Sequence, residues 1–445
     1  MNNPSVTPPL RPFKLLCLCD SPDLQTGFAR VAQNLLSRWH KSGAFEQIWV
    51  WGIGYNGFPH MLPYYLCPAV LLDFPHWHQP VNLARFLSAL ENDHVGATPG
   101  GFTHVWIMQD TFALTPLTED GRLRTVCRDM GIKSFLYFPV DAPLDPEWTR
   151  IIAEVDHPFA YCEYGRQAAI SGLSQSLPPP YPPSGNTRRR NAKVSVLPHG
   201  VEAACYRKIP AGEEGHKDEA RTVMFAGNVG TDDFLLVNVS QNQKRKALWH
   251  SLEVVAAIRA LRPDLNAKLY IHAPSTNKDE GLDLRQAASQ LGLTQDRAVF
   301  FSDKNFNRGH ALLDERQLNA IYNAADVLLS TSFGEGWGLP LTEAMAAGTA
   351  VAGPRHTSIG ELLADERGIL FDTSGHEMIV WDNSRLRPRT DILDAAHKLI
   401  AARDTPAGQF GSLAGYAARG QAWARSEFLS WDRIAQEWLA AFGVR

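Results

Sequence analysis

Two glutamates, Glu335 and Glu343, lie eight positions apart in a glycine-rich stretch, residues 330–353 (STSFGEGWGLPLTEAMAAGTAVAG). An apolar run precedes this stretch and small residues follow it. We therefore expect a strand, a turn, and a helix that Pro340 opens and Gly348 ends. Glu335 should precede the helix and Glu343 should lie in its first turn. Amides at the start of a helix favour a bound phosphate. Carboxylates only accept hydrogen bonds, so they suit a ligand rich in hydroxyl groups.

This stretch has two interpretations. In the first, backbone amides hold a diphosphate, and the two glutamates hold two sugars, one on each side of the diphosphate. In the second, Glu343 is a capping carboxylate and Glu335 faces solvent. The residue types alone are consistent with both.

A second candidate for chemistry is the sequence QNQKRK, residues 241–246. It stands between a predicted strand, residues 233–240, and a predicted helix that begins near Lys246. Basic residues at the start of a helix oppose its dipole, so a bound anion would stabilise this arrangement. We predict that Lys246 binds a phosphate; a solvated helix start is the alternative.

The composition limits what such a site can belong to. The chain has 445 residues, of which 44% are apolar and 20% charged, and its net charge is -4. This length predicts two domains, and this charge argues against a surface made wholly for nucleic acid. We find no apolar run of about 18 residues and no signal-peptide layout at the start. The six cysteines are scattered, as is typical of reduced thiols. We therefore expect a cytoplasmic protein without integral membrane contact.

Apolar runs of strand length alternate with helical segments along the chain. The first run, residues 13–19, ends at Asp20, and a helix should begin near Thr26–Gly27. This order predicts parallel α/β units. We expect two doubly wound, Rossmann-like domains that face each other across a cleft, with ligands beyond the carboxyl ends of their strands. The predicted boundaries are residues 1–205 and 206–425.

The end of the chain, residues 426–445, predicts one more helix. Its apolar residues recur on one side, and a stripe that wide needs a surface to cover: Trp431, Ile434, Ala435, Trp438, Leu439 and Phe442. We expect this helix to pack back across the domain junction.

The motif around the two glutamates closely resembles the EGFGLPxLEAMAxGxPV signature of retaining family 4 glycosyltransferases, which have the GT-B fold. The resemblance is strong over residues 194–371. It implies that Glu343 holds the ribose of a nucleotide-sugar donor and that Glu335 holds the transferred sugar. It also implies that backbone groups along the turn follow the sugar and the diphosphate: Gly336, Trp337, Gly338 and Leu339.

The basic cluster departs from the family pattern at one position. The family usually has an arginine five residues before its lysine; here Lys246 fits the lysine, but Gln241 stands in the place of the arginine. Lys244 and Arg245 could supply the missing charge. With Lys246, the resemblance places three further residues around the donor: Gln241, Asn242 and Arg245.

In the first domain, the resemblance points to one loop and one sheet edge. Gly27 matches the glycine loop that approaches the donor phosphates and the acceptor in the family; a plain turn is the alternative. Asp110 and Asp141 each follow a buried strand, where the cleft should be. The family often has a histidine in this region, and we predict that Asp141 takes its catalytic place, with a loop-capping aspartate as the alternative. His199 stands where the family usually has asparagine.

The resemblance implies a retaining transfer of a sugar from a nucleotide-diphosphate donor, without an obligatory metal. The acceptor is unidentified: a glycan, a lipid-linked sugar, a small molecule or nucleic acid. Arg188–Arg190, in a proline-rich loop, could contact an anionic acceptor or form a solvated loop. Two alternatives stay open. One is a non-catalytic nucleotide-sugar binder of the same fold, for which Gln241 would be a sign of drift, and the other is a sugar transferase that acts on nucleic acid.

Overall fold

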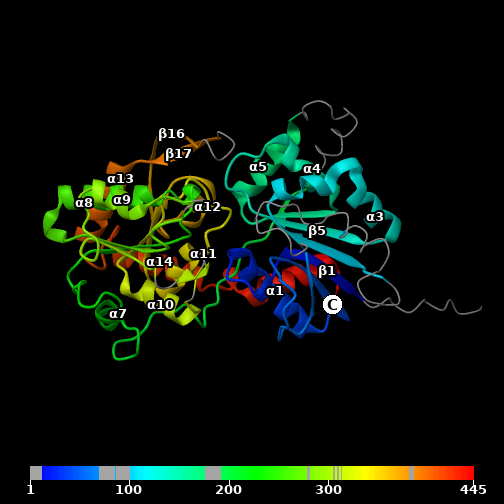
Figure 1. The fold of residues 1–445 in the computed structure, drawn as a ribbon, viewed down its shortest axis with the longest axis horizontal. Helices are drawn as coiled ribbons and strands as arrows, with labels where there is room; N and C mark the ends of the chain where they lie inside the picture. Colours follow the sequence, from blue (N-terminus) through cyan, green and yellow to red (C-terminus); the bar gives the residue numbers. More distant parts are fainter. Residues whose placement is uncertain are drawn as a thin grey trace, which may run out of the picture.

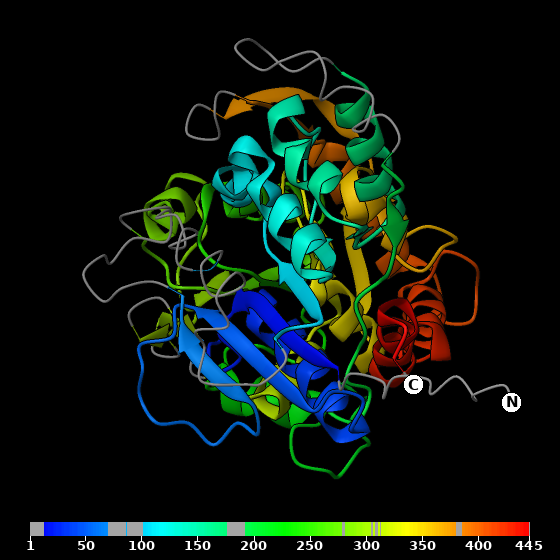
Figure 2. The same cartoon turned by 90° about the vertical axis from the view of Figure 1, so that its right-hand side faces the viewer.

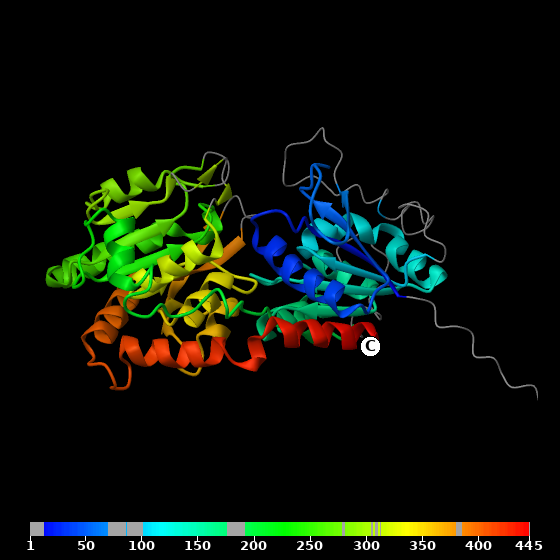
Figure 3. The ribbon, with the colours of Figure 1, turned by 90° about the horizontal axis from the view of Figure 1, so that it is seen from below.

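The computed structural model describes residues 13–69, 86, 101–175, 192–277, 281–303, 306–307, 310–311, 313–379 and 385–444. They form two lobes, seen side by side in Figure 1 and from below in Figure 3. Each lobe contains one parallel sheet with helices packed on it. This arrangement confirms the predicted pair of doubly wound α/β domains.

The first sheet has the strand order β3-β2-β1-β4-β5-β6-β7, and all neighbouring strands are parallel. Its strands are β1 (Lys14–Asp20), β2 (Gln47–Ile53), β3 (Tyr65–Pro68), β4 (His104–Met108), β5 (Lys133–Phe138), β6 (His157–Ala160) and β7 (Ser195–Val196). The interior strand β1 is buried along its whole length. Its continuous apolar run reflects this position, because both faces of a parallel sheet are covered.

Helices join these strands in chain order, and Figure 2 looks onto this first domain. They are α1 (Gly27–Ser42), η1 (Thr111–Gly121), α3 (Arg122–Met130), η2 (Pro146–Thr149), α4 (Arg150–Glu154) and α5 (Glu163–Ser174). α1 begins where the sequence predicts, because the Thr26 hydroxyl accepts a hydrogen bond from the Ala29 amide. The same hydroxyl donates to the Asp20 carboxylate at 2.6 Å. The end of β1 thus fixes the start of α1.

The second sheet has the order β10-β9-β8-β13-β14-β15, again parallel throughout. Its strands are β8 (Leu235–Val239), β9 (Lys268–His272), β10 (Val299–Phe301), β13 (Val327–Leu329), β14 (Ala350–Pro354) and β15 (Ile369–Phe371). Its helices are α7 (Lys217–Met224), η4 (Lys244–Lys246), α8 (Leu248–Leu261), η5 (Pro263–Leu265), α9 (Leu284–Gln290), α10 (Glu315–Ala324), α11 (Leu339–Ala347), α12 (Thr357–Leu362), α13 (Ile392–Asp404), α14 (Leu413–Ala424) and η7 (Glu427–Leu429).

Two small antiparallel sheets have no counterpart among the apolar runs of the sequence. One pairs β11 (Phe306–Asn307) with β12 (His310–Ala311). The other pairs β16 (Thr373–Ile379) with β17 (Arg385–Thr390) and stands at the top of the second domain in Figure 1. The β17 sequence, RLRPRT, lacks the apolar alternation that marks a strand covered on one face.

The last helix, α15 (Trp431–Phe442), returns from the second domain and lies along the first (Figure 3). All six residues of its apolar stripe are buried. Trp438 is fully buried, with its ring 6.2 Å from that of Trp39, 5.9 Å from Trp106 and 4.7 Å from Phe159. The C-terminus thus completes the core of the first domain on the face that carries α1.

This packing predicts a large stability effect at one position. We expect Trp438→Ala to lower the free energy of unfolding by about 3–5 kcal/mol, because the cavity it leaves cannot close among other large rings. Denaturant unfolding followed by circular dichroism would measure it. Phe428→Ala, which removes an aromatic ring that is 50% exposed, is the control. Equal effects of the two substitutions would show that α15 does not belong to the core.

Candidate functional site

The glycine-rich stretch joins β13 to α11 at the carboxyl end of the second sheet. Gly338 has a φ of +102°, a left-handed conformation that glycine adopts without strain, so α11 begins only at Leu339. Pro340 lies at the helix start and Gly348 ends it with a φ of +81°, both as predicted. Glu343 therefore lies in the second turn of α11. Its predicted place in the first turn is wrong, because α11 begins at Leu339, one residue before the predicted start at Pro340, which makes Glu343 the fifth residue of the helix.

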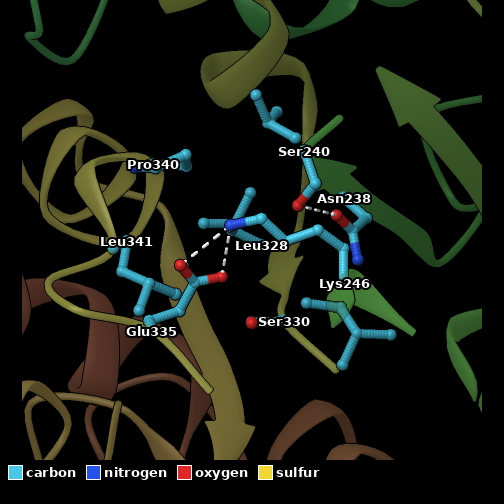
Figure 4. Close-up of a pocket in the computed structure, with 11 residues that line it drawn as sticks. Asn238, Ser240, Lys246, Leu328, Ser330, Glu335, Pro340 and Leu341 are labelled. Atoms are coloured by element: carbon cyan, nitrogen blue, oxygen red, sulfur yellow. Dashed lines mark hydrogen bonds and ion pairs between the residues drawn. The ribbon is translucent and has the colours of Figure 1, made fainter. Parts of the chain in front are cut away.

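A pocket lies between the ends of β8 and β13 and the start of α11 (Figure 4). The positive end of the α11 dipole borders it, which suits an anion. Its lining residues are Asn238, Val239, Ser240, Lys246, Leu328, Leu329, Ser330, Glu335, Gly338, Pro340 and Leu341. Two of the predicted site residues that carry charge, Lys246 and Glu335, are among them.

In this pocket Lys246 and Glu335 contact each other. Lys246 Nζ donates to both carboxylate oxygens of Glu335, at 2.7 and 2.8 Å. Burial alone would raise the pKa of Glu335, but Lys246 and Arg245 outweigh it and lower this pKa to about 2. Burial lowers the pKa of Lys246 below its usual value, although Glu335 opposes this shift. The pair combines an ionised carboxylate with an amine in one largely buried site.

Two arginines extend this pair to the first domain. Arg245 Nε lies 3.2 Å from the Asp141 carboxylate, and Arg245 Nη1 lies 3.5 Å from that of Glu335. Arg387, on β17, donates to the Asp141 carbonyl at 2.6 Å and lies 3.3 Å from its carboxylate. Side chains of alternating charge thus form one chain through the interface, here called the ion chain: Arg387, Asp141, Arg245, Glu335 and Lys246.

Glu343 is only 3% exposed and is held from both domains. Arg30, on α1, forms an ion pair with one carboxylate oxygen. The Tyr322 hydroxyl, on α10, donates to the other oxygen at 2.7 Å. Arg30 also lies 3.3 Å from the Tyr206 hydroxyl, and the neighbouring Glu343 raises the pKa of Arg30 above its usual value. The second glutamate of the motif therefore binds the first domain directly.

Glycines bring the two domains into contact here. A Cβ atom on Gly334 would lie 2.0 Å from the Asp141 carbonyl oxygen, and one on Gly336 would lie 2.4 Å from Pro139. A Cβ on Gly27 would lie 3.7 Å from Leu339. The loop predicted from Gly27 thus meets the start of α11, and the turn before α11 has no room for side chains at two of its positions.

Other predicted donor residues have different surroundings. Asn242 donates to the carbonyls of Pro274 and Leu282 at 3.1 and 2.8 Å, and accepts from the Leu282 amide at 3.1 Å. Gln241 is exposed. Neither belongs to the described residues that line the pocket. The structure therefore brings Arg245, but not Gln241 or Asn242, together with the Lys246–Glu335 pair.

His199 packs between aromatic rings at the domain junction. His199 is buried, 2.7 Å from the Tyr137 hydroxyl, and burial lowers its pKa to about 3. Its ring lies 5.6 Å from that of Trp337, which is also buried. His199 is therefore a neutral packing residue of the junction. Arg188–Arg190 lie outside the described residues.

Sequence reasoning missed three residues that shape the site: Arg30, Tyr322 and Arg387. Tyr322 lies on the apolar face of α10 and looks like an ordinary core residue. Arg30 follows Gly27 by one helical turn, and this is the one local sign that it lies near the site. Arg387 lies on a polar strand that no pattern marks.

Asp110 follows β4 at the sheet edge that also carries Asp20 and Asp141. Burial raises the pKa of Asp110 from 3.8 to about 7; Asp141 and Asp20 add to this shift and Arg245 opposes it. The first domain thus presents a carboxyl group that changes charge near neutral pH.

Residues 233–382 match the family model for glycosyl transferases group 1. D-inositol 3-phosphate glycosyltransferase from Stackebrandtia nassauensis is 27% identical over 260 residues, which cover 56% of this chain and 48% of that protein. The enzyme of the same name from Salinispora tropica is 28% identical over 261 residues, covering 56% and 46%. The chain thus spans about half the length of the curated relatives it matches.

Solved structures match nearly the whole chain. Anabaena HepE, in complex with UDP and glucose, has a TM-score of 0.64 at 15% identity and covers 97% of this chain and 99% of its own. Sucrose-phosphate synthase from Thermosynechococcus elongatus has the same TM-score and identity, with coverage of 97% and 98%. The chain has the GT-B fold.

Two features are absent from the described residues. None of their helices combines the length and the apolar character that a membrane crossing requires. Their His, Cys, Asp and Glu side chains nowhere gather in a group of three or more that could hold a metal ion.

The raised pKa of Asp110 predicts a pH-dependent effect of Asp110→Asn. The folded protein keeps the Asp110 proton up to about pH 7, whereas the unfolded chain releases it near pH 3.8. The stabilisation that protonated Asp110 gives the folded protein is therefore complete below pH 3.8 and is lost as the pH rises through about 7. We expect Asp110→Asn to raise Tm relative to wild type at pH 8, by roughly 2–4 °C more than at pH 5.

Thermal unfolding at both pH values would measure this difference, with Asp129→Asn, whose side chain is 57% exposed, as the control. A difference between Asp110→Asn and wild type that stays constant from pH 5 to pH 8 would contradict the raised pKa.

Proposed function

We propose that the chain is a retaining glycosyltransferase that moves a sugar from a nucleoside-diphosphate sugar to an acceptor hydroxyl. The observation that carries this proposal is the Lys246–Glu335 pair, in a pocket that the start of α11 borders. A cation and a helix N-terminus suit a diphosphate, and a carboxylate beside them suits sugar hydroxyls. The pocket lies beyond the carboxyl ends of parallel strands, where such folds bind ligands.

The comparisons support this proposal. The matched family model covers the pocket and the turn before α11. The curated relatives are named for transfer to D-inositol 3-phosphate, and HepE was solved with UDP-glucose as well as with UDP and glucose. A nucleotide-sugar is therefore the donor class that we propose for this chain.

Donor binding would exchange partners within the ion chain. Phosphate oxygens would accept the hydrogen bonds of Lys246, and sugar hydroxyls would donate to Glu335. Each buried charge keeps a partner in this exchange, which matters because an uncompensated buried charge costs about 3–5 kcal/mol. A carboxylate offers about four acceptor sites, so ribose hydroxyls could join Arg30 and Tyr322 on Glu343.

The chain's own cations would carry the charge of the leaving diphosphate. Lys246 and Arg245 stand beside the pocket, and their charges need no reorganisation as the bond to the sugar breaks. We infer that this chemistry needs no obligatory metal. A donor phosphate oxygen would take the acceptor proton, with attack on the face that the leaving group departs from, as a single-step transfer with retention requires.

The acceptor would bind against the first domain, at the sheet edge that carries Asp110 and Asp141. The Asp141 carboxylate already forms ion pairs with Arg245 and Arg387. This supports a positioning role for Asp141 in place of the direct catalytic one that the resemblance implies. The acceptor class stays open among a glycan, a lipid-linked sugar, a small molecule and nucleic acid.

Nucleotide binding is the first test. We expect calorimetry with UDP, GDP and ADP to find one that binds, and Lys246→Ala to weaken it by about 10-fold or more, since the lost hydrogen bond is charge-assisted. Lys217→Ala is the matched control, because Lys217 pairs with Asp326 at 2.6 Å in the same domain but does not line the pocket. Binding that is equal in both variants would remove Lys246 from the donor site.

Turnover is the second test. With the sugar form of the bound nucleotide, we expect Glu335→Ala to lower hydrolysis or transfer by about 100-fold, because an electrostatic contact to the reacting sugar is lost. Circular dichroism would confirm that the variant is folded. A wild-type protein that binds the nucleotide-sugar and never releases the sugar would be a non-catalytic binder. A product that forms only with nucleic acid present would identify that acceptor.

A further inference from the structure

The hairpin β16–β17 pairs only with itself among the described strands and extends beyond the family match. Its second strand, β17, lies outside the matched residues 233–382. Neither the motif nor the comparisons assign a role to it. Its position at the top of the second domain, beside the first, is visible in Figure 1.

The end of the hairpin where β16 finishes and β17 begins rests on the segments that carry the Lys246–Glu335 pair. Ile379 is 2% exposed and packs in one small cluster with Ala247 and Phe333. Ala247 directly follows Lys246, and Phe333 lies two positions before Glu335. The hairpin and both charged residues therefore belong to one packed unit of the second domain.

Two arginines of β17 bind a single segment of the first domain, residues 141–148. Arg385 donates to the Pro143 carbonyl at 2.9 Å, pairs with Asp145, and lies 4.0 Å from the ring centre of Trp148. Arg387 is 4% exposed and binds both the carbonyl and the carboxylate of Asp141.

Arg387 also stands beside the turn that carries Glu335. A Cβ on Gly334 would lie 3.2 Å from Arg387 Nη1 and 2.0 Å from the Asp141 carbonyl. Asp141 in turn binds Arg245, which reaches Glu335. Through Asp141, the Arg387 guanidinium thus connects the first domain to Arg245 and to the turn that carries Glu335.

We propose that Arg387 is a positioning residue that clamps residues 141–145 of the first domain onto the turn before α11. The clamp aligns the acceptor side with Glu335 and Lys246; in this respect the proposal rests on the proposed function. The donor pocket is lined by the second domain alone, so the clamp acts on turnover and leaves donor affinity nearly unchanged. A buried guanidinium that makes two contacts is poorly replaced by lysine.

The test compares Arg387→Ala with Arg389→Ala. Arg389 lies on the same strand, but it pairs with Glu253 of its own domain, at 3.7 Å. For Arg387→Ala we expect amide hydrogen exchange in residues 139–145 to rise by about 10-fold or more. We expect kcat to fall by about 10–100-fold, because the reacting groups are misaligned. The Kd for UDP, or for whichever nucleotide binds, should stay within about twofold.

Arg389→Ala should match wild type in all three measurements, and Arg387→Lys should recover only part of the loss. Unchanged exchange in residues 139–145 of Arg387→Ala, or an equal rise in Arg389→Ala, would overturn the clamp. If Arg387→Ala does not fold, Arg385→Ala, at a side chain that is 13% exposed, takes its place with the same expected results. A wild-type protein that binds no nucleotide would refute the proposed function, while hydrogen exchange would still decide the clamp.

Discussion

The ion chain is the interaction on which the arrangement of the two domains depends. Asp141 belongs to the first domain, and its two arginine partners belong to the second. Arg387 is buried and Asp141 keeps some exposure to solvent; removing Asp141 would take a partner from this buried guanidinium, which is costly. The two domains are therefore held in one register at this point. The ion chain also includes Glu335, so the contacts that fix this register also set how the first domain faces this carboxylate.

The ion chain can form only because backbone approaches backbone beside it. Gly334 and Gly336 lie so close to Asp141 and Pro139 that any side chain there would push the domains apart. Such a shift would also lengthen the Arg387–Asp141 and Arg245–Asp141 contacts. The glycines of the motif thus have a role beyond flexibility of the turn, because they set the closest approach of the two sheets. Gly27 differs, because a Cβ there would lie 3.7 Å from Leu339, which is an ordinary contact.

A second contact between the domains lies in the second turn of α11. Arg30 and Glu343 are 313 positions apart in the sequence, yet they form a largely buried pair. Tyr322 and Tyr206 surround this pair with hydroxyl groups. Both motif glutamates are therefore connected to the first domain, Glu335 indirectly through Arg245 and Asp141 and Glu343 directly through Arg30.

Elements that depend on local patterns could be predicted, and contacts between distant segments could not. Apolar runs marked β1 and β13, and Pro340 and Gly348 marked α11. The helix start was placed one residue too late, at Pro340 instead of Leu339, because the left-handed Gly338 that directly precedes the helix was not foreseen. Glu335 and Lys246 were both predicted as site residues, but their mutual contact spans 89 positions and depends on how β8 and β13 pair. Arg387 had no local signal at all, since its strand is polar and packs against another domain.

The pairing of each motif carboxylate with a cation has a consequence for what the site can bind. Under the proposed function, a diphosphate alone would take Lys246 from Glu335 and leave that carboxylate, which is 13% exposed, with Arg245 as its nearby cation. A sugar alone would offer hydroxyls to Glu335 but no anion to Lys246. Each half-ligand therefore leaves a buried group poorly compensated, at a cost of about 1–3 kcal/mol or more. A sugar joined to a diphosphate satisfies both groups at once. The Lys246–Glu335 pair that lines the pocket therefore favours the complete donor over either of its parts.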